Sequence, residues 1–190
     1  MTKNRLEAFS DGVIAIIITI MVLELKVPEG TDWHAIEHLV PVGLSYVLSF
    51  VFVGIYWNNH HHMLQATERI SGGVLWANLH LLFWLSLVPF VTGWMGENHW
   101  EQLPTAVYGV VLLMAAVAYT ILQRVICRIH DAHSPIVLAG QAGPKEWIST
   151  ALYAAAIPLA FVNQYVAHAM YVTVALIWLV PDRRIESRLK

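Results

Sequence analysis

Long apolar runs alternate with short polar segments along the chain. The runs are long enough to cross the ~30 Å hydrocarbon core of a bilayer, which takes about 20 helical residues. A membrane β-barrel would need alternating apolar and polar residues, and runs such as residues 13–18 do not alternate. The pattern predicts an all-α protein with six transmembrane helices, at approximately Leu6–Val27, Leu39–His60, Ile70–Met95, Pro104–Cys127, Glu146–Phe161 and Gln164–Val180.

Composition supports a membrane protein. Of the 190 residues, 57% are hydrophobic and 13% are charged, whereas soluble domains average about 25% charged residues. The net charge of -2 offers no basic patch for nucleic acid. No linker or low-complexity segment divides the chain, so residues 1–190 are predicted to form one six-helix domain.

The basic residues predict the orientation of the helices, because short cytoplasmic loops are enriched in Lys and Arg. With a cytoplasmic N-terminus, only Lys26 falls outside. An even number of helices also keeps the basic C-terminus in the cytoplasm. The residues then placed inside are Lys3, Arg5, Arg69, Arg124, Arg128, Lys145, Arg183, Arg184, Arg188 and Lys190.

The polar residues at the start of the first predicted helix need an explanation. Ser10 and Asp11 either cap the helix or lie inside it, within the membrane. A carboxylate inside the membrane normally faces protein or water and has a partner. Candidate partners are His61, at the end of the second predicted helix, and Asn78, inside the third.

The adjacent histidines His60, His61 and His62 raise the question of a metal site. Successive side chains on a helix point about 100° apart, so the three cannot all ligate one ion, and no His-x-x-x-His pair occurs within the cluster. We therefore predict no metal site. A proton-coupled or metal-ion transporter that uses Asp11 and the membrane histidines remains an alternative, as does a haem enzyme with paired histidines. No catalytic motif points to an enzyme.

Three segments carry a family resemblance. Residues 5–16 (RLEAFSDGVIAI), residues 56–61 (YWNNHH), and Asn78 with residues 86–92 (SLVPFVT) occur in the first half of the chain. Together they resemble the transmembrane protein 175 family, the endosomal and lysosomal potassium channels. The second half is similar only in helix count and hydropathy.

The resemblance implies a fold, a function and a site. A single six-helix repeat is similar to the prokaryotic members, which implies a homotetrameric, potassium-preferring channel in the cell membrane, with K⁺ as the permeant ion and no cofactor. The first helix would line the pore, with its hydrophobic constriction at Ile16, Thr19, Ile20 and Leu23. The residues expected to hold that helix in place are Arg5, Phe9, Ser10 and Asp11, with His61 and Asn78 as partners.

Overall fold

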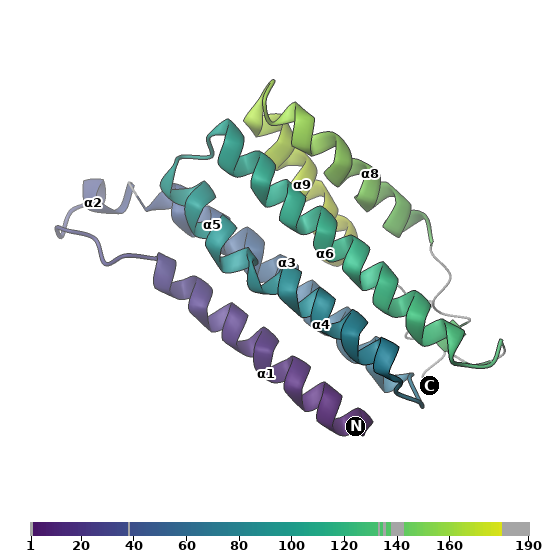
Figure 1. Ribbon diagram of the computed structural model, residues 1–190. Coiled ribbons are helices and arrows are strands. Elements are labelled where there is room, and N and C mark those ends of the chain that lie inside the picture. The colour runs from purple at the N-terminus through teal and green to yellow at the C-terminus, as the bar shows by residue number, and fades with distance from the viewer. Residues whose placement is uncertain (1, 38, 133, 135, 138–142, 180–190) are drawn as a thin grey trace.

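The protein is an elongated bundle of helices that run side by side (Figure 1). The computed structural model describes residues 2–37, 39–132, 134, 136–137 and 143–179. The fold is all-α, as predicted. Its described helices are α1 (Lys3–Met21), the 3₁₀ turn η1 (Val22–Glu24), α2 (Trp33–Glu37), α3 (Val40–Gln65), α4 (Gly72–Ser86), α5 (Val88–Glu97), α6 (Gln102–Arg128), α8 (Pro144–Leu159) and α9 (Gln164–Leu179).

Among the described residues, four continuous stretches are long and apolar enough to cross a membrane. They are Lys3–Glu24, Val40–Gln65, Gly72–Glu97 and Gln102–Arg128. The fifth and sixth predicted helices are present as α8 and α9, each with 16 residues. That these two cross the membrane stays a prediction. The last residue of the sixth predicted helix, Val180, and the basic residues 183–190 lie outside the described part of the chain.

The structure differs from the sequence prediction at two places. The third predicted helix is divided at Leu87 into α4 and α5, because Pro89 has no N–H to donate to the Leu85 carbonyl and its ring crowds that carbonyl. The short helix α2 was not predicted; it lies in the exposed connection between α1 and α3. Near that connection the Lys26 ammonium donates a hydrogen bond to the Glu97 carboxylate, and this bond raises the pKa of Lys26.

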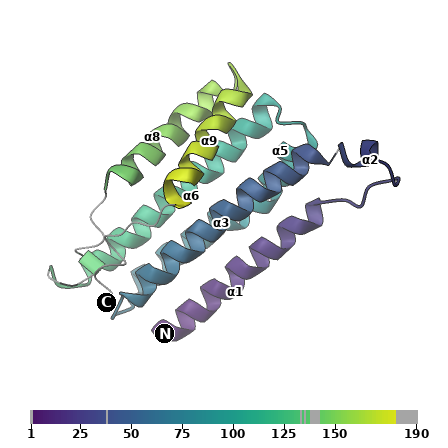
Figure 2. The ribbon, with the colours of Figure 1, turned by 180° about the vertical axis from the view of Figure 1, so that it is seen from behind.

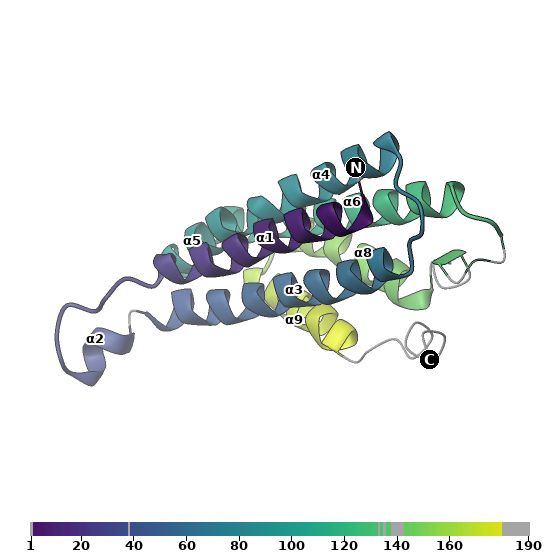
Figure 3. The ribbon, with the colours of Figure 1, turned by 90° about the horizontal axis from the view of Figure 1, so that it is seen from below.

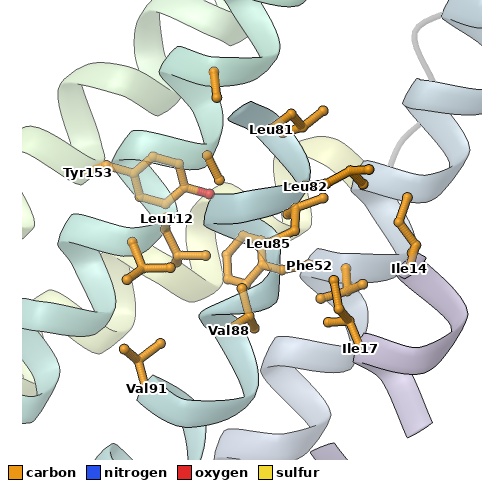
Figure 4. Close-up of a cluster of buried hydrophobic side chains, with 14 of the residues drawn as sticks. Ile14, Ile17, Phe52, Leu81, Leu82, Leu85, Val88, Val91, Leu112 and Tyr153 are labelled. Atoms are coloured by element: carbon orange, nitrogen blue, oxygen red, sulfur yellow. The ribbon is translucent and has the colours of Figure 1, made fainter. Parts of the chain in front are cut away.

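Helix α1 lies at one edge of the bundle, where it contacts α3, α4 and α5 (Figures 1 and 3). Helices α8 and α9 lie at the other side and pack against α6 (Figure 2). The buried core joins these layers (Figure 4). For example, Ile17 of α1, Leu85 of α4 and Leu112 of α6 are at most 4% exposed.

Glycines allow close helix contacts, as expected where lipid replaces water and packing drives helix association. A Cβ on Gly96 would lie 2.7 Å from the Cα of Val42, so α5 approaches α3 closely. A Cβ on Gly109 of α6 would lie 2.1 Å from the hydroxyl oxygen of Tyr171. That hydroxyl donates a 3.1 Å hydrogen bond to the Thr105 carbonyl and joins α9 to α6.

We predict that Gly109→Ala destabilises the fold by roughly 1–3 kcal/mol, the usual cost of overpacking a filled core. The added methyl displaces the Tyr171 hydroxyl from Thr105. Thermal unfolding of the detergent-solubilised protein measures the effect. Gly54→Ala is the matched control, because no atom lies within 4 Å of the added Cβ. Equal stability of the two variants would show that the Gly109 contact is unimportant.

Candidate functional site

Helix α1 has two different faces, although most of its residues are apolar. One face is buried against α3, α4 and α5 and carries Leu6, Ser10, Ile14, Ile17 and Met21. These positions repeat every three or four residues, the spacing of one helical stripe. A second stripe remains exposed on the subunit. It carries Arg5, Phe9, Gly12, Ile16, Thr19, Ile20 and Leu23.

The residues predicted to form a pore constriction all lie on the exposed stripe. Ile16 is 57% exposed, Ile20 is 42% exposed and Leu23 is 74% exposed. The Thr19 hydroxyl donates to the carbonyls of Ala15 and Ile16, at 3.1 and 3.0 Å, so its proton stays within the helix. Its oxygen still has acceptor capacity toward the open side of α1. The stripe therefore offers aliphatic groups and one hydroxyl to whatever lies beside it.

A chain of hydrogen bonds fixes the buried face of α1. The Ser10 hydroxyl donates to the Leu6 carbonyl at 2.9 Å and accepts from the Asn78 amide nitrogen at 3.0 Å. Asn78 Oδ1 in turn lies 2.7 Å from His60 Nε2. Because this amide oxygen can only accept, His60 must carry its proton on Nε2. Ser10, Asn78 and His60 are all at most 1% exposed.

A second polar contact joins α1 to α3 at the neighbouring position. The Trp57 indole N–H donates to Asp11 Oδ1 at 3.0 Å. The His61 ring stacks on Trp57, with ring centroids 5.9 Å apart and planes inclined by 22°. Asp11 thus has a partner on another helix, as a carboxylate within a membrane helix requires. Since α1 begins at Lys3, neither Ser10 nor Asp11 caps it.

The structure brings together only part of the polar set expected to hold α1. Ser10, Asp11 and Asn78 contact other helices as described above. Arg5 and Phe9 instead lie on the exposed stripe. Phe9 follows Arg5 by four residues and precedes Ile16 by seven, and these spacings place all three on one side of the helix. Within the described part of the chain, Arg5 forms no hydrogen bond or ion pair.

His61 was predicted to be a partner of the first helix, but it stacks on Trp57, and the histidine in the buried hydrogen-bond chain is His60. His60 shares a helix face with the buried residues Val53 and Leu64, seven residues before and four after it. His61 points about 100° away. Two residues of the site, His60 and Trp57, were thus not in the predicted set of partners. The apolar spacing around His60 was a usable signal for its burial, whereas nothing local indicated that Trp57 would reach Asp11.

The arrangement limits the chemistry of the site. No three His, Cys, Asp or Glu side chains are grouped as metal ligands among the residues that the structure describes. The exposed stripe of α1 carries no carboxylate or imidazole between Gly12 and Leu23. Such a surface can exclude or admit an ion by size and hydration, with few groups able to ligate it.

Comparisons with known proteins agree with this architecture. The profile of the family described as the endosomal/lysosomal potassium channel TMEM175 matches residues 5–89. A potassium channel of Chryseobacterium sp. strain P1-3 is 55% identical over 190 residues, which cover 100% of this chain and 99% of the relative. A potassium channel of Streptomyces collinus is 34% identical over 148 residues, covering 74% of this chain and 72% of that protein.

A solved structure has the same fold. The crystal structure of a lysosomal potassium-selective channel TMEM175 homologue from Chamaesiphon minutus superposes with a TM-score of 0.78. It is 26% identical in sequence, and the match covers 94% of this chain and 96% of that one. Fold and relatives together define an α-helical, multi-pass membrane channel. The chain belongs to the TMEM175 family.

We predict that Asn78→Leu destabilises the protein by roughly 1–2 kcal/mol, because it leaves the His60 N–H without its acceptor and Ser10 without its donor. The loss is measured by thermal unfolding in detergent. Thr173→Ala on α9 is the control, since Thr173 is exposed and lies outside this chain of hydrogen bonds. If Asn78→Leu unfolds at the same temperature as this control, the buried chain does not stabilise α1.

Proposed function

We propose that this protein is a potassium-preferring, weakly selective cation channel that works as a homotetramer. In this proposal the α1 helices of four subunits surround a central pore. The Chryseobacterium and Streptomyces relatives are potassium channels by name, and the Chamaesiphon homologue is described as potassium-selective, which supports potassium as the permeant ion. Conduction needs no bound cofactor and no chemical reaction, so the chain acts as a channel and not as an enzyme.

The observation that carries the proposal is the exposed stripe of α1. A buried chain of hydrogen bonds orients the helix, and this orientation turns Ile16, Thr19 and Leu23 out of the subunit. Arg5 and Thr19 are polar, so lipid is a poor environment for this stripe. Packing around a shared axis gives both residues water or protein neighbours.

The constriction would consist of rings of side chains from Ile16, Ile20 and Leu23, with Thr19 between them. Carbonyl-lined filters replace the hydration shell of an ion with oxygen ligands. Aliphatic rings offer no such replacement, so an ion passes according to the free energy needed to strip or distort its shell. Potassium holds its water less tightly than sodium, which gives a modest preference for potassium. The same rings can close the pore by dewetting.

Holding α1 in place is the proposed role of Ser10, Asp11, Asn78 and His60. Their contacts lie within one subunit and fix the rotation of α1 before assembly. Phe9 and Arg5, which lie on the exposed stripe, would act between subunits. Arg5 is then available to a carboxylate or carbonyl of a neighbouring copy.

Six spans with both termini in the cytoplasm form the proposed topology, in one domain over residues 1–190, within a prokaryotic cell membrane. Contacts at one end of the bundle support this orientation. The Lys3 ammonium donates to the Gln65 carbonyl at 2.6 Å, and His130 Nε2 accepts from the backbone N–H of Glu68 at 3.0 Å. These contacts gather the basic N-terminus and the α3–α4 and α6–α8 connections on one side, as the positive-inside rule requires. The Lys26–Glu97 pair is near the opposite ends of α1 and α5.

We predict that Ile16→Ala raises potassium flux into liposomes that contain the purified protein, and brings the potassium-to-sodium permeability ratio closer to one. The shorter side chain widens the ring and reduces the loss of hydration. Each 1.4 kcal/mol removed from the barrier corresponds to about a tenfold increase in rate. Single-channel recording in planar bilayers gives both quantities.

Ile121→Ala is the control for this experiment. Ile121 lies on α6, is 38% exposed, and loses the same number of carbon atoms. Conductance and selectivity of this variant should match those of the unmodified protein. The pore assignment fails if Ile16→Ala and Leu23→Ala both conduct and select like Ile121→Ala while assembling normally.

A further inference from the structure

Two more exposed apolar stripes lie on the helices that flank α1. On α4 and α5, the exposed positions follow alternating intervals of three and four residues, the spacing of a helix–helix seam. We call this set the α4–α5 seam; it comprises Trp76, Leu79, Phe83, Ser86 and Phe90. Its aromatic members protrude strongly: Trp76 is 76% exposed, Phe83 is 55% exposed and Phe90 is 63% exposed.

The second stripe is on α3 and is named the α3 seam. Its exposed members are Leu44, Val47, Phe50, Trp57 and Asn58. Beside Leu44 and Val47 a groove of about 370 Å³ runs between α3 and α9. Its walls are almost entirely apolar and include Leu48, Val51 and Leu176. Aromatic rings therefore protrude from α4 and α5 on one side of α1, and the groove beside α3 lies on the other side.

These two seams are on opposite sides of α1. Helix α1 contacts both α3 and α4 and lies between them in the view of Figure 3. The α3 seam also contains an exposed amide, Asn58, whereas the Ser86 hydroxyl of the other seam donates to the Phe83 carbonyl of its own helix. Polar groups within spans normally face protein or water. A protein neighbour is thus favoured over lipid on the α3 flank.

A cyclic assembly around α1 brings one flank of each copy against the other flank of the next, which is a heterologous interface. Rotation about an axis along the membrane normal leaves the depth of every residue unchanged. Two residues at the same depth in the membrane within one subunit, which we call level, are therefore also level when they belong to adjacent subunits. The internal contacts of one chain predict the register between two copies.

Three contacts give that register. Gly96 is level with Val42, where their backbones nearly touch. The Thr92 hydroxyl donates to Ser49 at 2.7 Å, and Asn78 meets His60 at 2.7 Å. Since α3 runs antiparallel to α4 and α5, Phe90 is level with residues 48–51 of α3. These are the residues at the groove.

We propose that the α4–α5 seam of one subunit docks on the α3 seam of the next, with the Phe90 ring in the groove between α3 and α9. The inference rests on the proposed homotetramer around α1, and it names the surfaces that hold that assembly together. Phe90 already stacks on Trp94, with ring centroids 6.0 Å apart, so the protruding ring is supported before docking. Phe83, further along the same seam, is level with residues 55–58 of α3. In the docked assembly it lies beside Trp57 of the neighbouring subunit.

Cysteine cross-linking in membranes tests the register. The background variant is Cys127→Ser, which removes the chain's single cysteine. In that background we expect Val47→Cys combined with Phe90→Cys to yield a ladder up to four subunits with a short bifunctional thiol reagent. The mismatched pair Val47→Cys with Trp76→Cys uses the same two surfaces. Trp76 lies 14 residues before Phe90, about 21 Å along the helix axis at 1.5 Å per residue, so its cysteine is far from the depth of Val47 and we expect no ladder.

A single-cysteine variant, Leu23→Cys, separates this inference from the proposed pore. If Leu23→Cys links subunits across the axis while the Val47/Phe90 pair does not, the docking register is wrong and the pore stands. Equal ladders from the matched and mismatched pairs also overturn the register. If neither Leu23→Cys nor the matched pair forms links, the assembly around α1 and the inference both fail.

Removal of the ring provides an independent measurement on the full-length protein. Phe90→Ala should shift the detergent-solubilised protein from tetramer toward smaller species in light scattering. Phe161→Ala removes the same group from a position that is 52% exposed in the α8–α9 connection, and should leave the mass unchanged. Identical masses for the two variants would contradict a role for Phe90 in the interface.

Discussion

Hydrogen bonds buried beneath one face of α1 set the rotation of that helix about its own axis. Most of α1 is apolar, so lipid or packing alone distinguishes its sides poorly. The buried amide of Asn78 donates to Ser10 and accepts from His60, and it keeps both bonds only when α1 turns Ser10 toward α4. The Trp57–Asp11 contact adds a second point of attachment nearby. Because unpaired polar groups are costly in a membrane, these few contacts decide which side of α1 leaves the subunit.

The proposed function depends on this rotation. A turn of about 100°, the angle between successive helical residues, would bring Ile17, which is now buried, to the position of Ile16 in the exposed stripe. The flanks of α1 are fixed at the same time, because α3 and α4 supply the partners of Ser10 and Asp11 and also carry the two exposed seams. One set of buried contacts therefore orients the α1 stripe that is proposed to line the pore. The same contacts orient the α3 seam and the α4–α5 seam, which are proposed to join neighbouring subunits.

Much of this architecture could be predicted from the sequence because it depends on apolar runs and helical spacing. The helices were placed to within a few residues, and Ser10, Asp11 and Asn78 were identified as residues that need partners. The third helix was predicted as one element, and its division at Leu87 near Pro89 was not placed. The choice of His60 over His61, the reach of Trp57 to Asp11, and the exposure of Arg5 depend on how helices distant in sequence are rotated against one another. Local sequence patterns do not carry that information.

The most direct test of the account is a cryo-electron microscopy structure of the purified protein in lipid nanodiscs. It would show how many chains assemble and what lines their common axis. The account predicts four copies, with Ile16, Ile20 and Leu23 of every α1 facing a central pore. An assembly whose axis is lined by another helix, or an α1 stripe that faces lipid, would contradict it.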